Sequence, residues 1–144
     1  MHILMCNDDG ILADGLRRLA SYLSQYYRIT VVAPANEQSA KSHALTTEIP
    51  LKLDAYNGED ENPRLYALTG TPSDCMKFGL SYLLSDDMPD LVISGINHGF
   101  NLGSDVLYSG TVSAAMESCF YGIPGLALSV ERYSPERGDE MHPF

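Results

Sequence analysis

The sequence predicts an α/β protein, a three-layer αβα sandwich in which helices cover both faces of a mainly parallel sheet. Short apolar runs alternate along the chain with segments whose apolar residues recur at helical spacing, and this alternation is typical of such sheets. The 144 residues fit one domain. We expect this domain to span residues 1–130 and to be followed by a flexible tail, 131–144, which is charged and contains two prolines.

The first half of the chain is predicted to form strands around one amphipathic helix. The strands are apolar runs bounded by turn residues, namely 2–6, 29–33, 51–55 and 65–69. A helix that begins near Leu12 is indicated by apolar side chains at i, i+3, i+4 and i+7, which are Leu16, Leu19, Ala20 and Leu23. Pro34 stops the second strand. The long polar segment 35–47 is a loop of a length that is usually functional or disordered.

The second half begins with a helix whose start has a physical explanation. Thr71 can cap the helix, Pro72 suits its first position, and Asp74 opposes the positive end of the helix dipole. A buried strand is then predicted at 90–94, followed by a loop without a regular pattern at 95–109.

The last predicted helix is followed by a strand at 125–129. Five apolar residues are expected to share the buried face of this helix: Val112, Ala115, Met116, Cys119 and Phe120. Ligands of a parallel sheet bind outside the carboxyl ends of its strands. The residues after the first strand, the loop from Ala35 and the loop from Gly95 all leave from that edge. Three distant regions are therefore expected to meet there.

Charge and cysteine content narrow the classes of partner. Nineteen acidic and nine basic residues give a net charge of −10, which argues against binding of long nucleic acid. The negative net charge still permits a small anionic ligand, provided that a metal ion and backbone dipoles supply a local positive field. The cysteines, Cys6, Cys75 and Cys119, each lie in an apolar run and are predicted to be buried thiols. No apolar run approaches the length of about 18 residues that a membrane span needs. We therefore expect a cytoplasmic protein with no membrane partner.

The segment Asn7-Asp8-Asp9-Gly10 directly follows the first strand. Neighbouring side chains of a strand point to opposite faces, so two adjacent aspartates converge only where the backbone turns, and Gly10 supplies such a turn. A divalent cation relieves the repulsion between two close carboxylates, and carboxylate oxygens suit Mg²⁺, Mn²⁺ or Ca²⁺. The alternative is a polar turn without a ligand, because Asn, Asp and Gly are common turn residues.

Two further stretches are candidates for binding a ligand. Glycines recur at every fourth position in the loop 95–103, which matches neither a dinucleotide-binding fingerprint nor a P-loop. Ser109-Gly110-Thr111 immediately precedes the last helix, where hydroxyls and free backbone N–H groups form an anion site. The alternative for this triplet is ordinary N-capping. Its position on the same sheet edge as the two aspartates favours phosphate.

Two covalent phosphatase mechanisms do not fit the sequence. An aspartyl-phosphate enzyme needs two aspartates separated by one residue after its first strand, whereas Asp8 and Asp9 are adjacent. A cysteine phosphatase needs an arginine six residues after its thiolate, and the residues at those positions are Leu12, Ser81 and Gly125. The remaining mechanism is attack on phosphorus by a metal-activated water.

Three motifs occur together in this chain: Asn7-Asp8-Asp9-Gly10, then Pro34 through Gln38-Ser39, then Ser94-Gly95-Ile96-Asn97-x-Gly99-x-Asn101-x-Gly103-x-Asp105-Val106-x-Tyr108-Ser109-Gly110-Thr111-Val112. With these motifs the chain closely resembles the SurE survival-protein family over residues 1–130. The resemblance implies a Rossmann-like fold and a metal-dependent phosphatase that hydrolyses nucleoside 5′- and 3′-monophosphates. The sequence departs from the family at Ala40 and Ser118, where glycine is usual.

The resemblance also implies the roles of individual residues and the partners. It makes Asp8 and Asp9 the catalytic residues and assigns one divalent ion per subunit, Mg²⁺ or Mn²⁺, to four ligands: Asp8, Asp9, Ser39 and Asn97. It makes Asn101, Ser109, Gly110 and Thr111 the substrate-binding residues. His98 and His43 are alternatives for the general base, because an imidazole titrates near neutrality. The expected partners are nucleoside monophosphates or other small phosphate esters and further copies of the chain, in a homodimer or higher homo-oligomer.

Family members continue well beyond the length of this chain. We therefore expect the C-terminal portion of the family fold to be absent from it. The alternative to a phosphatase is a truncated or inactive module that binds nucleotide and metal without turnover.

Overall fold

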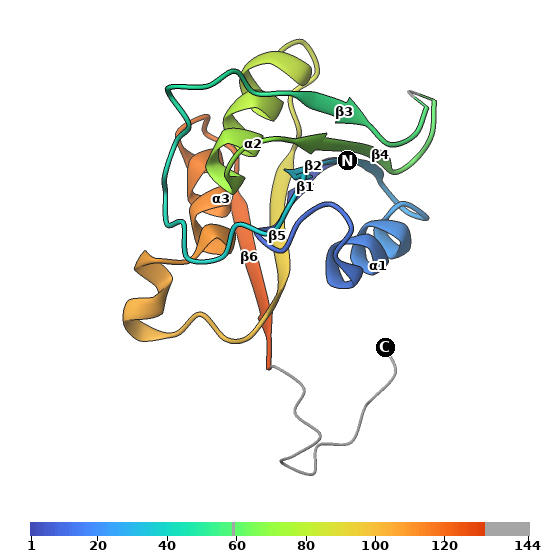
Figure 1. The fold of residues 1–144 in the computed structure, drawn as a ribbon. Helices are drawn as coiled ribbons and strands as arrows, with labels where there is room; N and C mark the ends of the chain where they lie inside the picture. Colours follow the sequence, from blue (N-terminus) through green and yellow to red (C-terminus); the bar gives the residue numbers. More distant parts are fainter. Residues whose placement is uncertain (59, 132–144) are drawn as a thin grey trace.

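A computed structural model describes residues 1–58 and 60–131 of the chain (Figure 1). The described strands form one six-stranded sheet in the order β3-β4-β2-β1-β5-β6. All neighbouring strands are parallel except β3 and β4, which are antiparallel. The elements in chain order are β1 (His2–Cys6), α1 (Asp14–Leu23), β2 (Arg28–Pro34), β3 (Leu53–Ala55), β4 (Arg64–Leu68), α2 (Pro72–Phe78), the short π-helix η1 (Gly79–Leu83), β5 (Leu91–His98), the short 3₁₀ helix η2 (Gly103–Leu107), α3 (Gly110–Cys119) and β6 (Gly125–Val130). The predicted α/β class with a mainly parallel sheet is confirmed.

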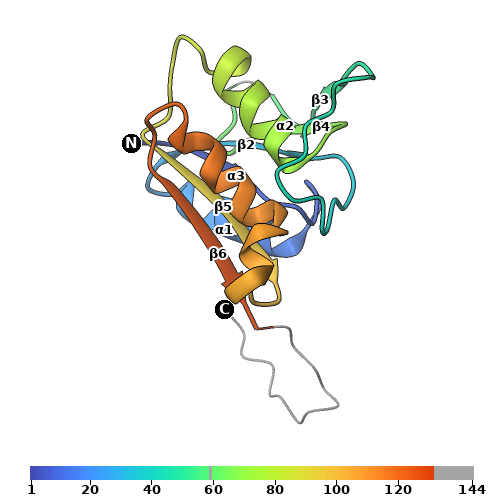
Figure 2. The ribbon, with the colours of Figure 1, turned by 90° about the vertical axis from the view of Figure 1, so that its left-hand side faces the viewer.

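Helix α1 covers one face of the sheet, and α2 and α3 cover the other (Figures 1 and 2). Strand β1 shows how the sequence divides between the two cores, because all its residues are buried and neighbouring side chains point to opposite faces. Ile3 and Met5 pack in the core beneath α1, and Leu4 and Cys6 pack in the core beneath α2 and α3. The three layers therefore follow from an uninterrupted apolar strand between two helix layers.

The predicted start of α2 is confirmed as a reciprocal cap. The Thr71 hydroxyl accepts a hydrogen bond of 3.1 Å from the backbone N–H of Asp74. The Asp74 carboxylate in turn accepts one of 2.9 Å from the backbone N–H of Thr71. Two N–H groups that the helix itself leaves unpaired are thereby satisfied.

Strand β5 is longer than the sequence pattern indicates. The prediction ended it at Gly95, but it continues to His98 because its last residues pair with β6, Asn97 with Ser129 and His98 with Val130. Gly95 has φ +132° and faces β6 so closely that a Cβ atom there would overlap the carbonyl oxygen of Leu128. The glycine therefore permits a shift in pairing instead of ending the strand. Other predicted boundaries differ by a few residues; α1, for example, begins at Asp14.

The predicted buried face of α3 was wrong for three of its five residues, whereas Ala115 is buried and Val112 is half-buried. Met116 is 50% exposed and Phe120 74% exposed, and the thiol of Cys119 is also exposed rather than buried. The buried side of the helix consists of small or polar residues, namely Gly110, Thr111, Ser113, Ala114, Ala115, Glu117 and Ser118. The reason is close packing against β6, because a Cβ atom at Gly125 would lie 2.7 Å from Ser118 Oγ. Large side chains would not fit there.

Two further predictions concern the tail 131–144 and membrane-spanning segments. Apart from Glu131, the segment 131–144 lies outside the described residues, and the domain boundary at 130 stays a prediction. Within residues 1–58 and 60–131, no helix has the length and apolar character needed to cross a membrane.

Candidate active site

The candidate site lies where the direction of strand order reverses. From β1 the chain passes through α1 to β2 on one side, while β5 flanks β1 on the other side. Ligands in open α/β sheets bind outside the carboxyl ends of the strands at this switch point. Asp8 and Asp9 follow β1, and Asn97 lies near the end of β5. The topology therefore brings these predicted residues to one edge of the sheet.

Asn7 and Gly10 form the turn that carries the two aspartates. Asn7 Nδ2 donates to the Gly10 carbonyl at 3.0 Å, and the Gly10 N–H donates to Asn7 Oδ1 at 3.1 Å. Asn7 is fully buried, and Gly10 has φ +102°, a conformation that favours glycine. The polar-turn interpretation thus accounts for Asn7 and Gly10. The hydrogen bonds of this turn do not involve the side chains of Asp8 and Asp9, which are free to make other contacts.

Asp8 is held against the N-terminus of α3. Thr111 Oγ1 donates a 2.6 Å hydrogen bond to Asp8 Oδ1, and both side chains are buried. A Cβ atom at Gly110 would lie 2.8 Å from Asp8 Cβ, so only glycine allows the helix to approach this closely. The Asp8 carbonyl also accepts a 2.7 Å hydrogen bond from the backbone N–H of Gln38. Asp8 therefore joins β1, the loop 35–47 and α3.

Asp9 has a carboxylate oxygen without a protein partner. Among the described residues, no group donates a hydrogen bond to its buried Oδ2 atom. Burial raises the pKa of Asp9, and the charge of Asp8 raises it further, whereas His98 lowers it. A buried carboxylate oxygen with no donor, beside a second carboxylate, is an environment that a bound cation stabilises. This pair of carboxylates thus fits a divalent metal.

The other predicted metal ligands lie on the segments that flank the aspartates. Ser39, next to Gln38, is exposed, and its Oγ atom donates to Glu37 Oε1 at 2.7 Å. Asn97 Nδ2 donates to the Gly99 carbonyl at 2.7 Å, which leaves its amide oxygen for another partner. The donor chemistry is suitable, and the four-residue ligand set stays a prediction.

The predicted substrate-binding residues occupy two places. Ser109 caps α3, because its Oγ atom accepts a 3.2 Å hydrogen bond from the N–H of Val112. The capping alternative is therefore present, together with the helix N-terminus that could bind an anion. Asn101 is bound to the edge strand β6 through a 2.7 Å hydrogen bond from its Nδ2 atom to Ser129 Oγ. Their role in binding substrate stays a prediction.

Sequence reasoning missed a contact between the loop 35–47 and α3. His43 Nε2 lies 2.6 Å from Glu117 Oε2, and Glu117 is only 5% exposed. A second contact joins the loop to α2, where Thr46 Oγ1 donates to Asp74 Oδ2 at 2.6 Å. Seventy-four residues separate His43 from Glu117, and no motif spans that distance. Ala40 in the same loop has φ +57°, which explains why glycine suits that position.

Replacing His43 by alanine is expected to lower the free energy of unfolding by about 1–3 kcal/mol, because the Glu117 carboxylate loses its partner while remaining buried. Urea denaturation followed by circular dichroism measures the change. Lys41→Ala is the matched control, since Lys41 is an exposed residue of the same loop. Equal stability of the two variants would show that the His43–Glu117 contact is dispensable.

The family model for "Survival protein SurE" matches residues 3–143 of the chain. The chain belongs to the SurE family. Its curated relatives include the "5'-nucleotidase SurE" of Thermoanaerobacter sp. (strain X514), which is 54% identical over 129 residues that cover 90% of this chain and 50% of the relative. The protein of the same name from Caldanaerobacter subterraneus subsp. tengcongensis is 49% identical over 143 residues, or 99% of this chain and 55% of the relative.

A solved structure of the same family supports the fold. The crystal structure of the SurE protein from Aquifex aeolicus has a TM-score of 0.79 to this chain at 43% sequence identity. The match covers 90% of this chain and 50% of that one. The chain thus spans about half the length of the SurE relatives that it matches.

Proposed function

We propose that this chain forms the metal- and phosphate-binding part of a 5′-nucleotidase, a phosphomonoesterase that converts nucleoside monophosphates to nucleoside and phosphate. The observation that carries the proposal is the adjacent pair Asp8 and Asp9, in which one buried carboxylate oxygen has no donor and the other carboxylate contacts the N-terminus of α3. The curated relatives named 5'-nucleotidase support the choice of reaction. Nucleoside 3′-monophosphates are included as substrates.

The metal would be one Mg²⁺ or Mn²⁺ ion, held by Asp8, Asp9, Ser39 and Asn97. When bound, such an ion neutralises phosphate oxygens and lowers the pKa of water. Weak neutral ligands such as the Ser39 hydroxyl and the Asn97 amide oxygen leave positions for substrate.

The protein's own groups orient the substrate around this position. Thr111 fixes the rotamer of Asp8 through its 2.6 Å hydrogen bond and so keeps that carboxylate at the edge of the sheet. The backbone N–H groups and positive dipole at the start of α3 would bind the phosphate oxygens, with Ser109, Gly110 and Thr111 supplying this turn. Asn101 would contact the rest of the substrate.

The cellular setting and assembly are part of the same proposal. The free buried thiols of Cys6 and Cys75 suit a reducing cytoplasm. Strand β6 forms an edge of the described sheet and exposes Leu126, which is 45% accessible. Unpaired apolar edges favour association, and we propose a homodimer or higher homo-oligomer.

Removal of divalent metal is expected to abolish phosphate release from AMP. Dialysed protein is assayed with Mn²⁺ or Mg²⁺, then with excess chelator, and then after the metal is restored. Activity that depends reversibly on metal supports the proposal, and equal turnover with and without metal would contradict it. Calorimetry on the same sample distinguishes the alternative, because metal-dependent AMP binding without phosphate release indicates a binding module.

A further inference from the structure

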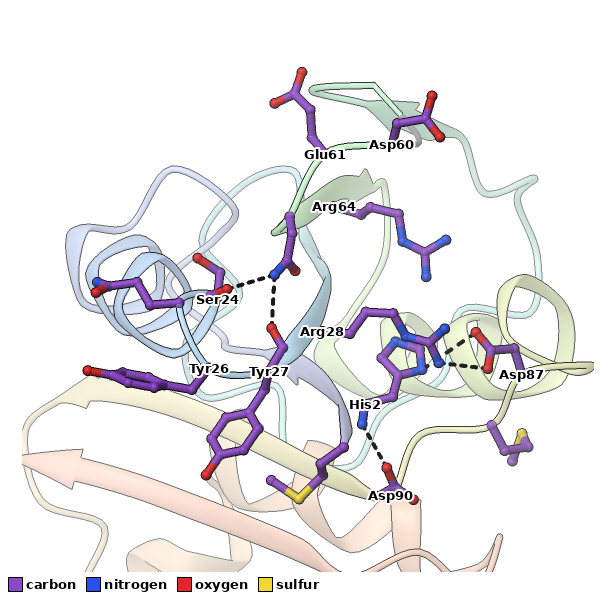
Figure 3. Close-up of a pocket in the computed structure, with 14 residues that line it drawn as sticks. His2, Ser24, Tyr26, Tyr27, Arg28, Asp60, Glu61, Arg64, Asp87 and Asp90 are labelled. Atoms are coloured by element: carbon purple, nitrogen blue, oxygen red, sulfur yellow. Dashed lines mark hydrogen bonds and ion pairs between the residues drawn. The ribbon is translucent and has the colours of Figure 1, made fainter.

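A pocket lies at the opposite edge of the sheet from Asp8, at the amino ends of the strands (Figure 3). Its volume is about 920 Å³. His2 at the start of β1, Arg28 at the start of β2 and Arg64 at the start of β4 contribute side chains to it. The motifs of the candidate active site do not reach this pocket, so its role requires a separate explanation.

His2, which lines the pocket, has a buried ring nitrogen without a hydrogen-bond partner among the described residues. The residue is 3% exposed, and its Nδ1 atom makes no hydrogen bond within the described residues. The carboxylate oxygen Asp87 Oδ2 is 3.8 Å from Nδ1, which is too far for a hydrogen bond. Burial and the charge of Arg28 lower the pKa of His2, which favours the neutral ring, although the charge of Asp87 acts in the opposite direction. One of its two nitrogens therefore carries the single proton.

The contacts of Thr30 determine which nitrogen carries that proton. Thr30 Oγ1 lies 3.0 Å from Arg64 Nη2, which can only donate, and 3.0 Å from His2 Nε2. The buried hydroxyl proton of Thr30 needs an acceptor, and His2 Nε2 is the acceptor that the described residues offer. The arrangement that satisfies all three groups places the histidine proton on Nδ1. His2 thus directs a buried N–H donor toward Asp87, which lines the pocket.

Arg64 has unused donors on the same wall. Its one hydrogen bond within the described residues goes to Thr30, and no described carboxylate lies within 4.0 Å of its guanidinium nitrogens. A guanidinium group has five N–H donors, so most of them remain free. Arg28, by contrast, is paired with Asp87 at 2.7 Å. The carboxylate of Asp87 therefore sits between Arg28 and His2, where an external anion would bind.

Asn62 connects two segments of the pocket wall. Asn62 Nδ2 donates to the carbonyls of Ser24 at 2.8 Å and Tyr27 at 2.9 Å. Asn62 Oδ1 accepts from the N–H of Ile29 at 2.8 Å. These bonds join the β3–β4 turn to the turn after α1 and hold this part of the wall in place. A preformed site loses less conformational freedom on binding.

We propose that this pocket binds a small phosphate-bearing molecule, with the phosphate contacting Arg64, Arg28 and His2. A phosphate accepts hydrogen bonds from several directions, which suits donors supplied by three different strands. Four acidic residues also line the pocket. Asp90 accepts a 2.7 Å hydrogen bond from the backbone N–H of His2, Asp87 is paired with Arg28, and Glu61 accepts hydrogen bonds from Asn57 and Gly58. The charge of Asp60 opposes an anion, so the phosphate must gain more from the arginines than it loses to this carboxylate. The volume leaves room for the remainder of an ester beside the ring of Tyr27 (Figure 3). The proposal is independent of the nucleotidase function.

Amide-resolved NMR titration of the labelled chain tests this proposal. Inorganic phosphate and ribose 5-phosphate are the probes, and EDTA is present to remove metal from the Asp8 site. We expect saturable shifts of the His2, Arg28 and Arg64 amides. Tighter binding of ribose 5-phosphate than of phosphate would identify an ester as the ligand, and equal binding would identify the phosphate group alone; both support the site. Shifts confined to Gly110 and Thr111, or no saturation, would overturn it.

Two substitutions with opposite expected effects sharpen the test. Arg64→Gln should raise the dissociation constant at least about tenfold, the effect of losing a hydrogen bond to a charged group. Asp87→Asn should lower it about threefold, because the internal competitor for Arg28 loses its charge. Arg18→Gln and Asp86→Asn, exposed residues that do not line the pocket, are matched controls. If Arg64→Gln fails to fold, the direction of the Asp87→Asn effect decides: unchanged or weaker binding contradicts the proposal.

Discussion

Replacing Asp8 by asparagine is expected to reduce metal-dependent phosphate release from AMP at least about 100-fold, the scale of removing one strong electrostatic group from an active site. Asparagine has nearly the same volume as aspartate and keeps an oxygen that can accept the 2.6 Å hydrogen bond from Thr111. The substitution therefore removes the negative charge and leaves the contact with α3. A steady-state assay with saturating Mn²⁺ measures the effect.

The Asp8→Asn prediction has a second measurement and a matched control. Calorimetry should show weaker Mn²⁺ binding, because one of the two carboxylates at the proposed metal position is lost. Asp14→Asn makes the same chemical change at an exposed position in the first turn of α1 and should behave like the unaltered chain. Wild-type turnover in Asp8→Asn would place the active site elsewhere.

Gly110→Ala is the second substitution with a large expected effect. The added Cβ atom would lie 2.8 Å from Asp8 Cβ and 3.1 Å from Pro72 Cγ, distances at which the neighbours must move. Such overpacking lowers the free energy of unfolding by about 1–3 kcal/mol. Because Asp8 itself is displaced, phosphate release should also fall at least about tenfold, since a small misplacement of a catalytic group is costly.

Denaturant unfolding and the AMP assay on the same preparation measure both consequences. Gly58→Ala is the control, because a Cβ atom at Gly58 would meet nothing nearer than 3.7 Å. A stable Gly110→Ala variant with full activity would contradict the inference that α3 positions Asp8. Loss of stability with normal activity would limit the role of Gly110 to packing.

Local sequence signals predicted those features that depend on neighbouring residues. The alternation of apolar runs and amphipathic segments predicted the layered sheet, because each element's buried face is encoded in its own periodicity. The cap at Thr71 and Asp74 was predictable because both partners lie three residues apart. The turn at Gly10 was predictable for the same reason.

Features that depend on packing between distant elements were not predictable. Strand β5 extends past Gly95 because β6 supplies hydrogen-bond partners, a fact that no local pattern contains. The apolar residues of α3 did not mark its buried face, since Met116 and Phe120 are exposed and Glu117 is buried. Helix periodicity assumes that apolar side chains face the core. The close approach of Gly125 to Ala115 and Ser118 leaves no room for large side chains at that contact, and Glu117 is buried through its contact with His43.

The features of the candidate site likewise fall into those that local sequence predicts and those that depend on contacts between distant segments. The sequence by itself determined that two carboxylates follow β1, that a Ser-Gly-Thr turn begins a helix, and that these motifs resemble those of SurE proteins. Only the tertiary structure decided that Thr111 contacts Asp8, that Asp9 Oδ2 is left without a donor, and that His43 reaches Glu117. The physical reason is the separation along the chain between the residues that interact. Composition and periodicity act over a few residues, whereas contacts such as that between Thr111 and Asp8 form only when the sheet brings distant segments to one edge.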